Sequence, residues 1–259
     1  MPPSSPTDPR ALSSKSRAEL SEGRSEESLH ELVGDLLKRS VPPRAVVVDV
    51  GCGRGTLWPR VAAIQARYIG MDVVAYRAFP AECEFVEADL NARWPLKSNY
   101  ADAVVSIETV EHMENPRAFV REIARVVKPG GLVVISTPNQ LSLLSKLCLV
   151  VKNEFVQFQE RPGLYPGHIT ALLELDLRRI ALECGLREPL AIYSGHGRVP
   201  FTERSYPRFV SRTFPRACSD NIFLVARKPL PAYGRASTLA KSSSAAVRPL
   251  ADTLSDPGR

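Results

Sequence analysis

The sequence predicts an α/β protein built around an open, doubly wound sheet. Residues 45–50 form an apolar run rich in β-branched side chains, with Asp49 as its one polar residue, which is typical of a strand buried on both faces of a parallel sheet. Strand-like and helix-like segments then alternate as far as residue 226, as they do in α/β proteins. A glycine-rich stretch at residues 51–55 directly follows the first strand. Because ligands of such sheets bind at the carboxyl ends of the strands, we expect the functional site there.

The expected helices have recognisable ends. Ser25 is available to cap the first helix, Pro129 stops a later one, and Gly185 follows the last. We expect helices at residues 25–39, 56–67, 116–127 and 171–184, and strands at residues 45–50, 68–71, 84–87, 101–107, 132–136, 190–193 and 222–226.

A single domain, residues 25–230, is expected between two disordered ends. The chain has 259 residues, of which 44% are hydrophobic and 24% charged, close to globular averages. Residues 1–24 are rich in Ser, Pro and charge, and residues 231–259 in Ala, Ser, Pro and Gly. Neither end has enough apolar surface to offset the entropy lost on ordering. Within the domain, residues 140–170 form an insert with many apolar and aromatic side chains, which fits a lid over a ligand pocket or a plain packing segment.

Cysteine usage and hydropathy bear on the cellular environment. The five cysteines are scattered and contain no CxxC pair, so no zinc site of that kind is expected, and an odd number without a pattern fits a reducing compartment. No signal peptide is recognisable. The most apolar stretch, residues 141–151, is far shorter than the roughly 20 residues that span a bilayer. We therefore expect a cytoplasmic protein without a membrane span.

The positive charge of the chain is concentrated late in the sequence. The net charge is +6. Between residues 198 and 228 the acidic residues are Glu203 and Asp220. The basic residues there are Arg198, Arg204, Arg208, Arg212, Arg216, Arg227 and Lys228. This segment could meet a phosphorylated, lipid-headgroup or RNA partner, or it could be an ordinary solvated surface.

The strongest local signal is the run from Asp49 to Thr56, which joins the first strand to a helix through three glycines. Glycine allows positive φ angles and a close approach of the backbone to a ligand. A dinucleotide-binding loop would have its third glycine at position 56, where this chain has threonine. The spacing therefore favours a different cofactor.

The run resembles motif I of the class I S-adenosylmethionine-dependent methyltransferases, and the resemblance continues along the chain. Residues 68–72 are similar to that family's second strand with its ribose-binding acid, Asp72. Residues 87–90 are similar to the motif whose Asp contacts the adenine amino group, and residues 127–131 match a further hallmark. The resemblance implies a Rossmann-like, seven-stranded, mostly parallel sheet with a late antiparallel strand, and S-adenosylmethionine as cofactor. The cofactor residues that it implies are Asp49, Gly51, Cys52, Gly53, Gly55, Met71, Asp72, Asp89, Leu90 and Glu108.

The acceptor side is expected beyond the fourth and fifth strands. Glu108, Glu111 and His112 have i, i+3, i+4 spacing, which would place them on one helical face. His168 comes later, before the last helix. Methyl transfer to a hydroxyl needs a base that deprotonates the acceptor. We expect His112, His168 and Glu111 to be the catalytic residues.

The same four residues allow a second interpretation. The E-x-x-E-H run with a later His resembles the ubiquinone-pathway O-methyltransferases. It also resembles small-RNA 2′-O-methyltransferases, in which two Glu and two His hold a divalent metal. Glu108, Glu111, His112 and His168 would then be metal ligands. In other methyltransferases of similar pattern, Glu111 and His112 merely organise the cofactor pocket, and we favour a metal-free site.

The leading hypothesis is thus an enzyme that O-methylates a small molecule, lipid or saccharide. Residues 136–139 lack the Asn-Pro-Pro-aromatic pattern associated with amino methylation of nucleobases. A metal-dependent RNA 2′-O-methyltransferase is the alternative, but without an aromatic and basic RNA-binding platform a nucleic-acid partner is not favoured. A non-catalytic cofactor-binding protein is the third hypothesis.

Overall fold

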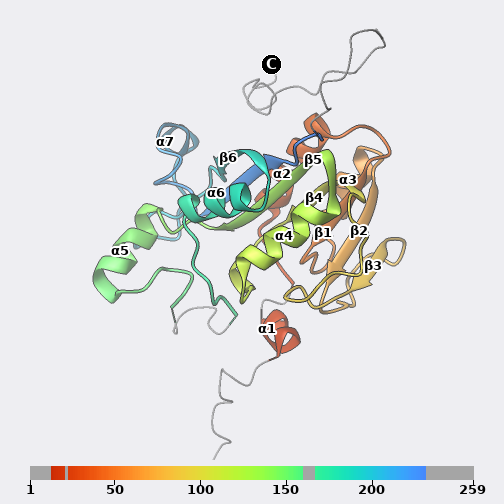
Figure 1. Cartoon of the computed structure of the whole chain (residues 1–259). Coiled ribbons are helices and arrows are strands. Elements are labelled where there is room, and N and C mark those ends of the chain that lie inside the picture. Colours follow the sequence, from red (N-terminus) through yellow and green to blue (C-terminus); the bar gives the residue numbers. More distant parts are fainter. Residues whose placement is uncertain (1–12, 21–22, 160–166, 232–259) are drawn as a thin grey trace, which may run out of the picture.

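The computed structural model describes residues 13–20, 23–159 and 167–231. Its centre is a seven-stranded sheet with the strand order β3-β2-β1-β4-β5-β7-β6 (Figure 1). β7 is antiparallel to both of its neighbours, whereas the pairs from β3 to β5 are parallel. The predicted fold class is confirmed. The strands are β1 (Val46–Val50), β2 (Arg67–Asp72), β3 (Glu84–Glu87), β4 (Ala101–Ser106), β5 (Val127–Pro138), β6 (Arg187–Tyr193) and β7 (Asn221–Arg227).

Helices cover both faces of the sheet. The helices α2 (Glu27–Ser40) and α3 (Trp58–Ala63) pack on one face, and α4 (Pro116–Val126) and α6 (Glu174–Glu183) pack on the other. Successive strand residues point to opposite faces, so Val47 belongs to the first core and Val48 to the second. This explains why the first strand is apolar at every position except Asp49.

The strand order reverses between β1 and β4, which both lie at the centre of the sheet. β1 pairs with β2 on one side and with β4 on the other. The connections after β1 and β4 therefore leave in opposite directions and open a crevice at the carboxyl ends of these strands. Of the residues predicted to be functional, Gly51 and Gly53 follow β1, and Glu108 and His112 follow β4.

β5 is longer than expected. We expected residues 129–131 to separate the helix from a short strand, but α4 leads directly into β5 at Val127. Gly130 adopts φ +78° and donates its N–H to the carbonyl of Lys228 at 2.8 Å, so the glycines are accommodated inside the paired strand. The bridge between Val127 and Ala101 of β4, and the hydrogen bonds of Gly130 and Gly131 with Lys228 just after β7, extend the strand at a place where local sequence signals predict a break.

The N-terminal segment contains a helix, α1 (Ser14–Leu20), so the expectation of disorder for residues 1–24 is wrong for this part. The Tyr76 hydroxyl donates to the carbonyl of Ala18 at 2.9 Å and ties α1 to the loop after β2. Residues 1–12, 21–22 and 232–259, which include the expected C-terminal tail, lie outside the described residues.

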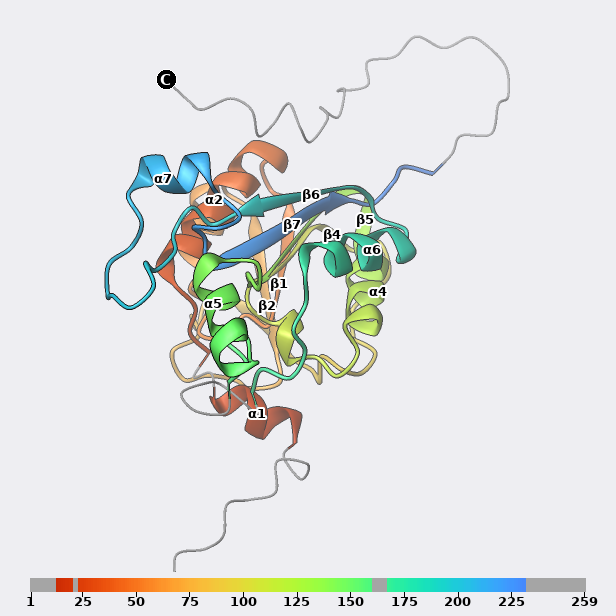
Figure 2. The same cartoon turned by 90° about the vertical axis from the view of Figure 1, so that its left-hand side faces the viewer.

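The insert after β5 forms the helix α5 (Leu143–Lys152), and a short helix α7 (Arg208–Thr213) lies in the connection between β6 and β7. Both helices lie on the same side of the molecule (Figure 2). Residues 160–166 of the expected lid lie outside the described residues. Within the described part of the chain, every helix is too short or too polar to cross a bilayer.

Candidate functional site

The glycine loop at the end of β1 is held against β2. The N–H groups of Gly51 and Cys52 donate to the carbonyl of Met71, at 2.8 and 3.3 Å. Gly51 has φ +73°, and a Cβ there would lie 2.2 Å from Thr109 Oγ1. Gly53 has φ +50°. Both positions therefore require glycine, for backbone conformation and for lack of space.

Asp72 ends β2 beside this loop. Its Oδ2 accepts from the N–H of Gly53 at 2.9 Å, and its Oδ1 accepts from Val73 and Val74 at 2.7 and 3.2 Å. Burial raises the pKa of Asp72, although these three N–H groups act in the opposite direction. Asp72 lines a small cavity of about 60 Å³ together with Asp89 and Leu90, as predicted for cofactor residues.

Asp49, in β1, is buried below the loop. It accepts a hydrogen bond from the Tyr68 hydroxyl at 2.7 Å. Burial raises its pKa to about 7, because the nearly complete loss of solvent disfavours the charged form more than the Tyr68 donor favours it. Burial therefore makes Asp49 easier to protonate than an exposed aspartate.

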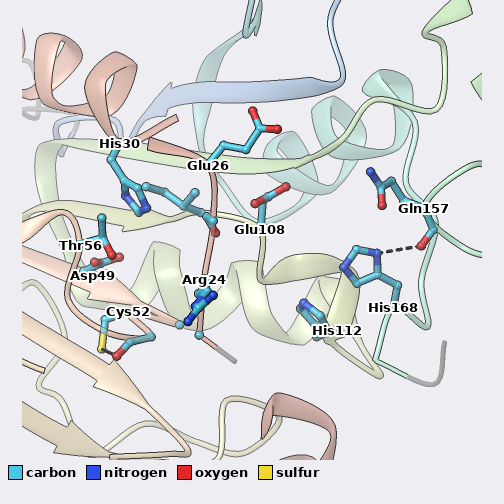
Figure 3. Close-up of a pocket in the computed structure, with 15 residues that line it drawn as sticks. Arg24, Glu26, His30, Asp49, Cys52, Thr56, Glu108, His112, Gln157 and His168 are labelled. Atoms are coloured by element: carbon cyan, nitrogen blue, oxygen red, sulfur yellow. Dashed lines mark hydrogen bonds between the residues drawn. The ribbon is translucent and has the colours of Figure 1, made fainter. Parts of the chain in front are cut away.

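A larger cavity of about 500 Å³ adjoins the small one, and Gly51, Glu108 and His112 line both (Figure 3). This volume is in the usual range for small-molecule sites. The lining is largely polar, and from the insert after β5 it includes Gln157 and His168 rather than apolar side chains. The expected apolar lid is therefore not what faces the cavity in the described part of the insert.

Glu108 does not share a helical face with Glu111 and His112, contrary to the expectation from their spacing. It has φ +47° and precedes a single 3₁₀ turn, η2 (Val110–His112). Its N–H donates to Ser136 Oγ at 3.0 Å, and its Oε1 accepts from Asn221 Nδ2 at 2.7 Å. Partners on β5 and β7 override the helical pattern and point the carboxyl into the cavity. Burial raises the pKa of Glu108.

The two predicted histidines meet, although they are far apart in the sequence. The rings of His112 and His168 are 4.7 Å apart between centroids, and both line the larger cavity. His112 Nδ1 lies 2.8 Å from the carbonyl oxygen of Gly167. His168 Nδ1 lies 3.0 Å from the carbonyl oxygen of Gln157 (Figure 3). A carbonyl only accepts, so each Nδ1 carries a proton, and the neutral form of either ring has its lone pair on Nε2. Burial, followed by the neighbouring His112, lowers the pKa of His168 to about 4.

Glu111 lies behind the histidines. Its backbone carbonyl accepts from the N–H groups of Ile169 and Thr170, at 3.0 and 2.9 Å, and so holds the segment that carries His168. Its side chain is fully buried, and among the described residues neither carboxyl oxygen has a hydrogen bond of good geometry, although the nearby Thr137 hydroxyl slightly lowers its pKa. Burial, with a smaller effect of Glu108, raises the pKa of Glu111 well above its usual value.

One cluster in the described chain has the composition of a metal site. Glu111, His112 and His168 each offer a ligand atom, and these atoms lie within 4.8 Å of one another. Glu108, the fourth residue of the predicted set, is not in this cluster. With Nδ1 protonated in both rings, Nε2 is the nitrogen through which either imidazole would bind a metal in its neutral form.

Two predicted cofactor residues do not line either cavity. The Met71 side chain is buried in the core, and only its carbonyl supports the loop. Gly55 has φ +75°, and a Cβ there would lie 2.6 Å from Pro80 Cδ, so this glycine serves the contact with the loop after β2. The other predicted cofactor residues, Asp49, Gly51, Cys52, Gly53, Asp72, Asp89, Leu90 and Glu108, line one or both cavities.

Sequence analysis missed the N-terminal contribution to these cavities. Ser14 and Ala18 line the small cavity, and residues 23–26 line the large one. The carbonyl of Gly23 accepts from Arg54 N at 3.3 Å, which seats this segment on the glycine loop. The segment is short and polar, so no hydrophobic pattern could reveal its position.

His30, on α2, was also missed. Its side chain is buried, lines the large cavity, and has no hydrogen-bond partner for either ring nitrogen among the described residues. Burial lowers its pKa to about 4. Its only sequence signal is a polar residue on the buried face of a helix, which is weak.

The fold and the site define an α/β protein whose cavities lie around a glycine loop and strand-end carboxylates, the arrangement of a nucleoside-cofactor site. A family model described as a methyltransferase domain matches residues 48–135. A ubiquinone biosynthesis O-methyltransferase of Thiobacillus denitrificans is 33% identical over 172 aligned positions, covering 61% of this chain and 73% of that protein. A probable S-adenosylmethionine-dependent methyltransferase of Mycolicibacterium smegmatis is 26% identical over 197 positions, covering 74% and 71%.

The fold is also shared with solved structures. The crystal structure of a SAM-dependent methyltransferase from Archaeoglobus fulgidus is similar with a TM-score of 0.56 and 19% sequence identity, covering 77% of this chain and 94% of that one. This chain belongs to the class I S-adenosylmethionine-dependent methyltransferases. Its cofactor is S-adenosylmethionine, and the family resemblance drawn from the motifs is confirmed.

Proposed function

We propose that this enzyme O-methylates a small molecule in the larger cavity, with His112 as the base. The observation that carries the proposal is the pair of imidazoles, His112 and His168, each held by a carbonyl at Nδ1, in a cavity that shares residues with the small cavity beside Asp72. S-adenosylmethionine supplies an activated methyl group when bound. The protein must then align an acceptor hydroxyl and take its proton.

The proposed cofactor residues fit the role in differing degree. Gly51 and Gly53 leave the backbone of the loop accessible beside the cavities. A carboxylate accepts about four hydrogen bonds. Asp72 already accepts three hydrogen bonds from the backbone, so it can accept about one more, from a single ribose hydroxyl. Asp89 accepts from Asn91 N at 3.0 Å and keeps more capacity.

The two histidines are assigned different parts. A general base works best when its pKa is near the working pH. With a pKa of about 4, His168 is neutral but weakly basic, so we assign it to positioning the acceptor. His112 lines both cavities, between cofactor and acceptor, and is the better base. Glu111 lines neither cavity and acts as a positioning residue through its carbonyl.

The acceptor is proposed to be a small polar hydroxyl compound or the polar head of a lipid or saccharide. The lining supplies Gln157, Glu26 and Arg24 besides the histidines, and Ile107 is among its few apolar residues. The Thiobacillus relative named as an O-methyltransferase supports transfer to oxygen.

A metal-assisted version of the same reaction is the second candidate. The specific observation in its favour is the Glu111 carboxyl, which is buried beside two imidazoles and has no hydrogen bond of good geometry among the described residues. A divalent ion held by these three residues would satisfy the carboxylate and bind the acceptor oxygen as a Lewis acid. Imidazole ligands suit a transition metal better than Mg²⁺.

Calorimetry and an acceptor screen test the proposal. We expect binding of S-adenosylmethionine and its demethylated product, and none of NAD. A cell extract supplied with the cofactor should yield an acceptor that gains one methyl group on oxygen. Methylation of nitrogen or carbon alone would refute O-methylation, and inhibition by a chelator with rescue by added divalent ion would select the metal-assisted version.

A further inference from the structure

The connection between β6 and β7 presents exposed aromatic side chains together with arginines. Phe201 is 93% exposed, Phe209 72% and Phe214 62%. Single exposed apolar residues are ordinary, but three phenylalanines in one connection are unusual for a surface that meets only water. We call Phe201, Phe209 and Phe214 the aromatic surface: Phe209 lies in α7, Phe214 directly follows it, and Phe201 lies in the loop before it. α7 lies on the side of the molecule that faces the viewer in Figure 2.

Phe201 is held out by a tight turn. Residues 198 and 205 form an antiparallel bridge, Val199 N donates to the Arg204 carbonyl at 2.8 Å, and Thr202 N donates to the Val199 carbonyl at 3.1 Å. Phe201, at the tip, has φ +62°. A bulky residue in the left-handed region is strained, and such strain marks functional positions. A glycine or asparagine would form this turn with less strain, which is consistent with a function for the exposed aromatic ring.

The segment that carries the aromatic surface is predominantly positive. Residues 198–216 contain five arginines and a single acidic residue, Glu203. Arg198 pairs with Asp220 and Arg216 with Glu174. The exposed Arg204, Arg208 and Arg212 form no ion pair with any acidic side chain in the described part of the chain. Their charge is therefore available to an anionic partner.

We propose that this surface docks the enzyme on an anionic membrane. Aromatic rings that enter the headgroup boundary, flanked by arginines that contact anionic headgroups, are the combination that holds proteins at a bilayer surface. The rings project from a turn and a short helix instead of forming the flat stacking platform of single-stranded RNA binders. α5 lies on the same side, and Val150 and Val151 at its end are strongly exposed.

Docking here would serve the proposed acceptor site, although the inference does not depend on it. α5 belongs to the insert that also supplies Gln157 and His168 to the larger cavity. A bilayer on this side would bring a lipid-borne hydroxyl to the side of the protein that carries these residues.

Sedimentation of the full chain with vesicles tests the proposal. We expect binding to phosphatidylcholine vesicles that contain phosphatidylglycerol, weakening with salt, and little binding to phosphatidylcholine alone. The triple change Arg204→Gln, Arg208→Gln and Arg212→Gln should lower the partition coefficient on the order of 100-fold, since each arginine near a charged bilayer contributes a factor of about five.

A second variant isolates the aromatic rings. Phe201→Asn, Phe209→Ser and Phe214→Ser together should lower partitioning at least about 10-fold. Asparagine tolerates the left-handed turn, so the fold should be retained. Leu182→Ser, at a 46% exposed position on α6, is the matched control and should bind vesicles as wild type does. Binding of S-adenosylmethionine, measured without vesicles, should be unchanged in all variants.

Three results would overturn the proposal. The first is absence of binding to anionic vesicles, or equal binding by the wild type and both triple variants. The second is binding of single-stranded RNA that the same changes abolish while vesicles are ignored. The third is a dimer that the phenylalanine changes dissociate in the absence of vesicle binding. Because vesicle binding is measured without an acceptor, failure here is separate from failure of the proposed O-methylation.

Discussion

Two buried carboxyl groups, one at the end of β2 and one in the turn after β4, differ in how well they are hydrogen-bonded. Asp72, on the cofactor side, accepts three backbone hydrogen bonds. Glu111, beside the histidines, is fully buried, and among the described residues its carboxyl oxygens have no hydrogen bond of good geometry, with the Thr137 hydroxyl as a neighbouring donor. A buried polar group that is poorly hydrogen-bonded costs about 1–3 kcal/mol, and more if it is charged. The chain thus satisfies the Asp72 carboxylate, whereas burial favours the protonated form of Glu111.

The histidines extend this contrast. His112 and His168 are each fixed at Nδ1 by a carbonyl, which sets the orientation of both rings. The glycine loop, in comparison, offers shape and backbone groups. In the proposed assignment the loop and Asp72 bind the cofactor and the histidines act on the acceptor, so substitutions in the two groups should change different measured constants.

The largest effect is expected for the proposed base. His112→Ala should lower turnover by about 10²–10⁴-fold, because proton removal from the acceptor loses its base. The affinity for S-adenosylmethionine should barely change. Steady-state kinetics and calorimetry measure the two quantities, and His196→Ala, at an exposed loop position, is the control. Full activity of both His112→Ala and His168→Ala would show that the acceptor site lies elsewhere.

Gly53→Val should have the next largest effect, now on binding. A Cβ at Gly53 would lie 2.5 Å from the carbonyl oxygen of Gly23, and φ is +50°. We expect cofactor affinity to fall about 100-fold or more, since the loop and the N-terminal segment must both shift. Gly195→Val, at φ +72° with no atom within 4 Å of its Cβ, has a similar backbone strain in open space. Equal loss of affinity in both variants would mean that contact with the N-terminal segment is irrelevant to the site.

Asp72→Ala should weaken cofactor binding by about 1–3 kcal/mol, the cost of losing a charge-assisted hydrogen bond in a desolvated site. The change also frees three backbone N–H groups. Asp72→Asn keeps one acceptor oxygen and should lose less. Titration calorimetry ranks the variants, and wild-type affinity in Asp72→Ala would remove this residue from the cofactor site.

The smallest effect concerns stability and pH at Glu111. Its pKa is raised in the folded state, so the folded protein keeps a proton that the unfolded chain releases above about pH 4.3. This contribution is present below that pH and is lost as the pH rises, by about 1.4 kcal/mol per pH unit while the folded group stays protonated. Glu111→Gln mimics the neutral acid, so its stability should depend less on pH. Asp49 contributes with the same sign in both proteins and cancels.

Denaturant unfolding from pH 5 to pH 8 measures this difference. Parallel curves for the wild type and Glu111→Gln would show that Glu111 is not held neutral. If added divalent metal removes the pH dependence in the wild type but not in Glu111→Gln, the carboxylate is a metal ligand, and the metal-assisted version of the reaction gains its direct support.

Most of the sheet, and the strand-end residues that we propose for the cofactor, could be predicted from local patterns. The apolar run of β1, the glycines after it and Asp72 at the end of β2 are recognised from short stretches, because each stretch reports its own burial and its own turn. Seven strands were expected close to where the structure has them, and β3 matches residue for residue. The motif spacing around the loop was enough to favour S-adenosylmethionine over a dinucleotide.

Contacts between distant segments determine the remainder. The helical face expected for Glu108 is replaced by hydrogen bonds to Ser136 and Asn221, and His112 meets His168 only because the Glu111 carbonyl holds the later segment. α1 and the residues after it line the cavities through contacts with the loops after β1 and β2. Such contacts depend on where the sheet order brings loops together, and spacing along one segment carries no information about a partner that lies many residues away.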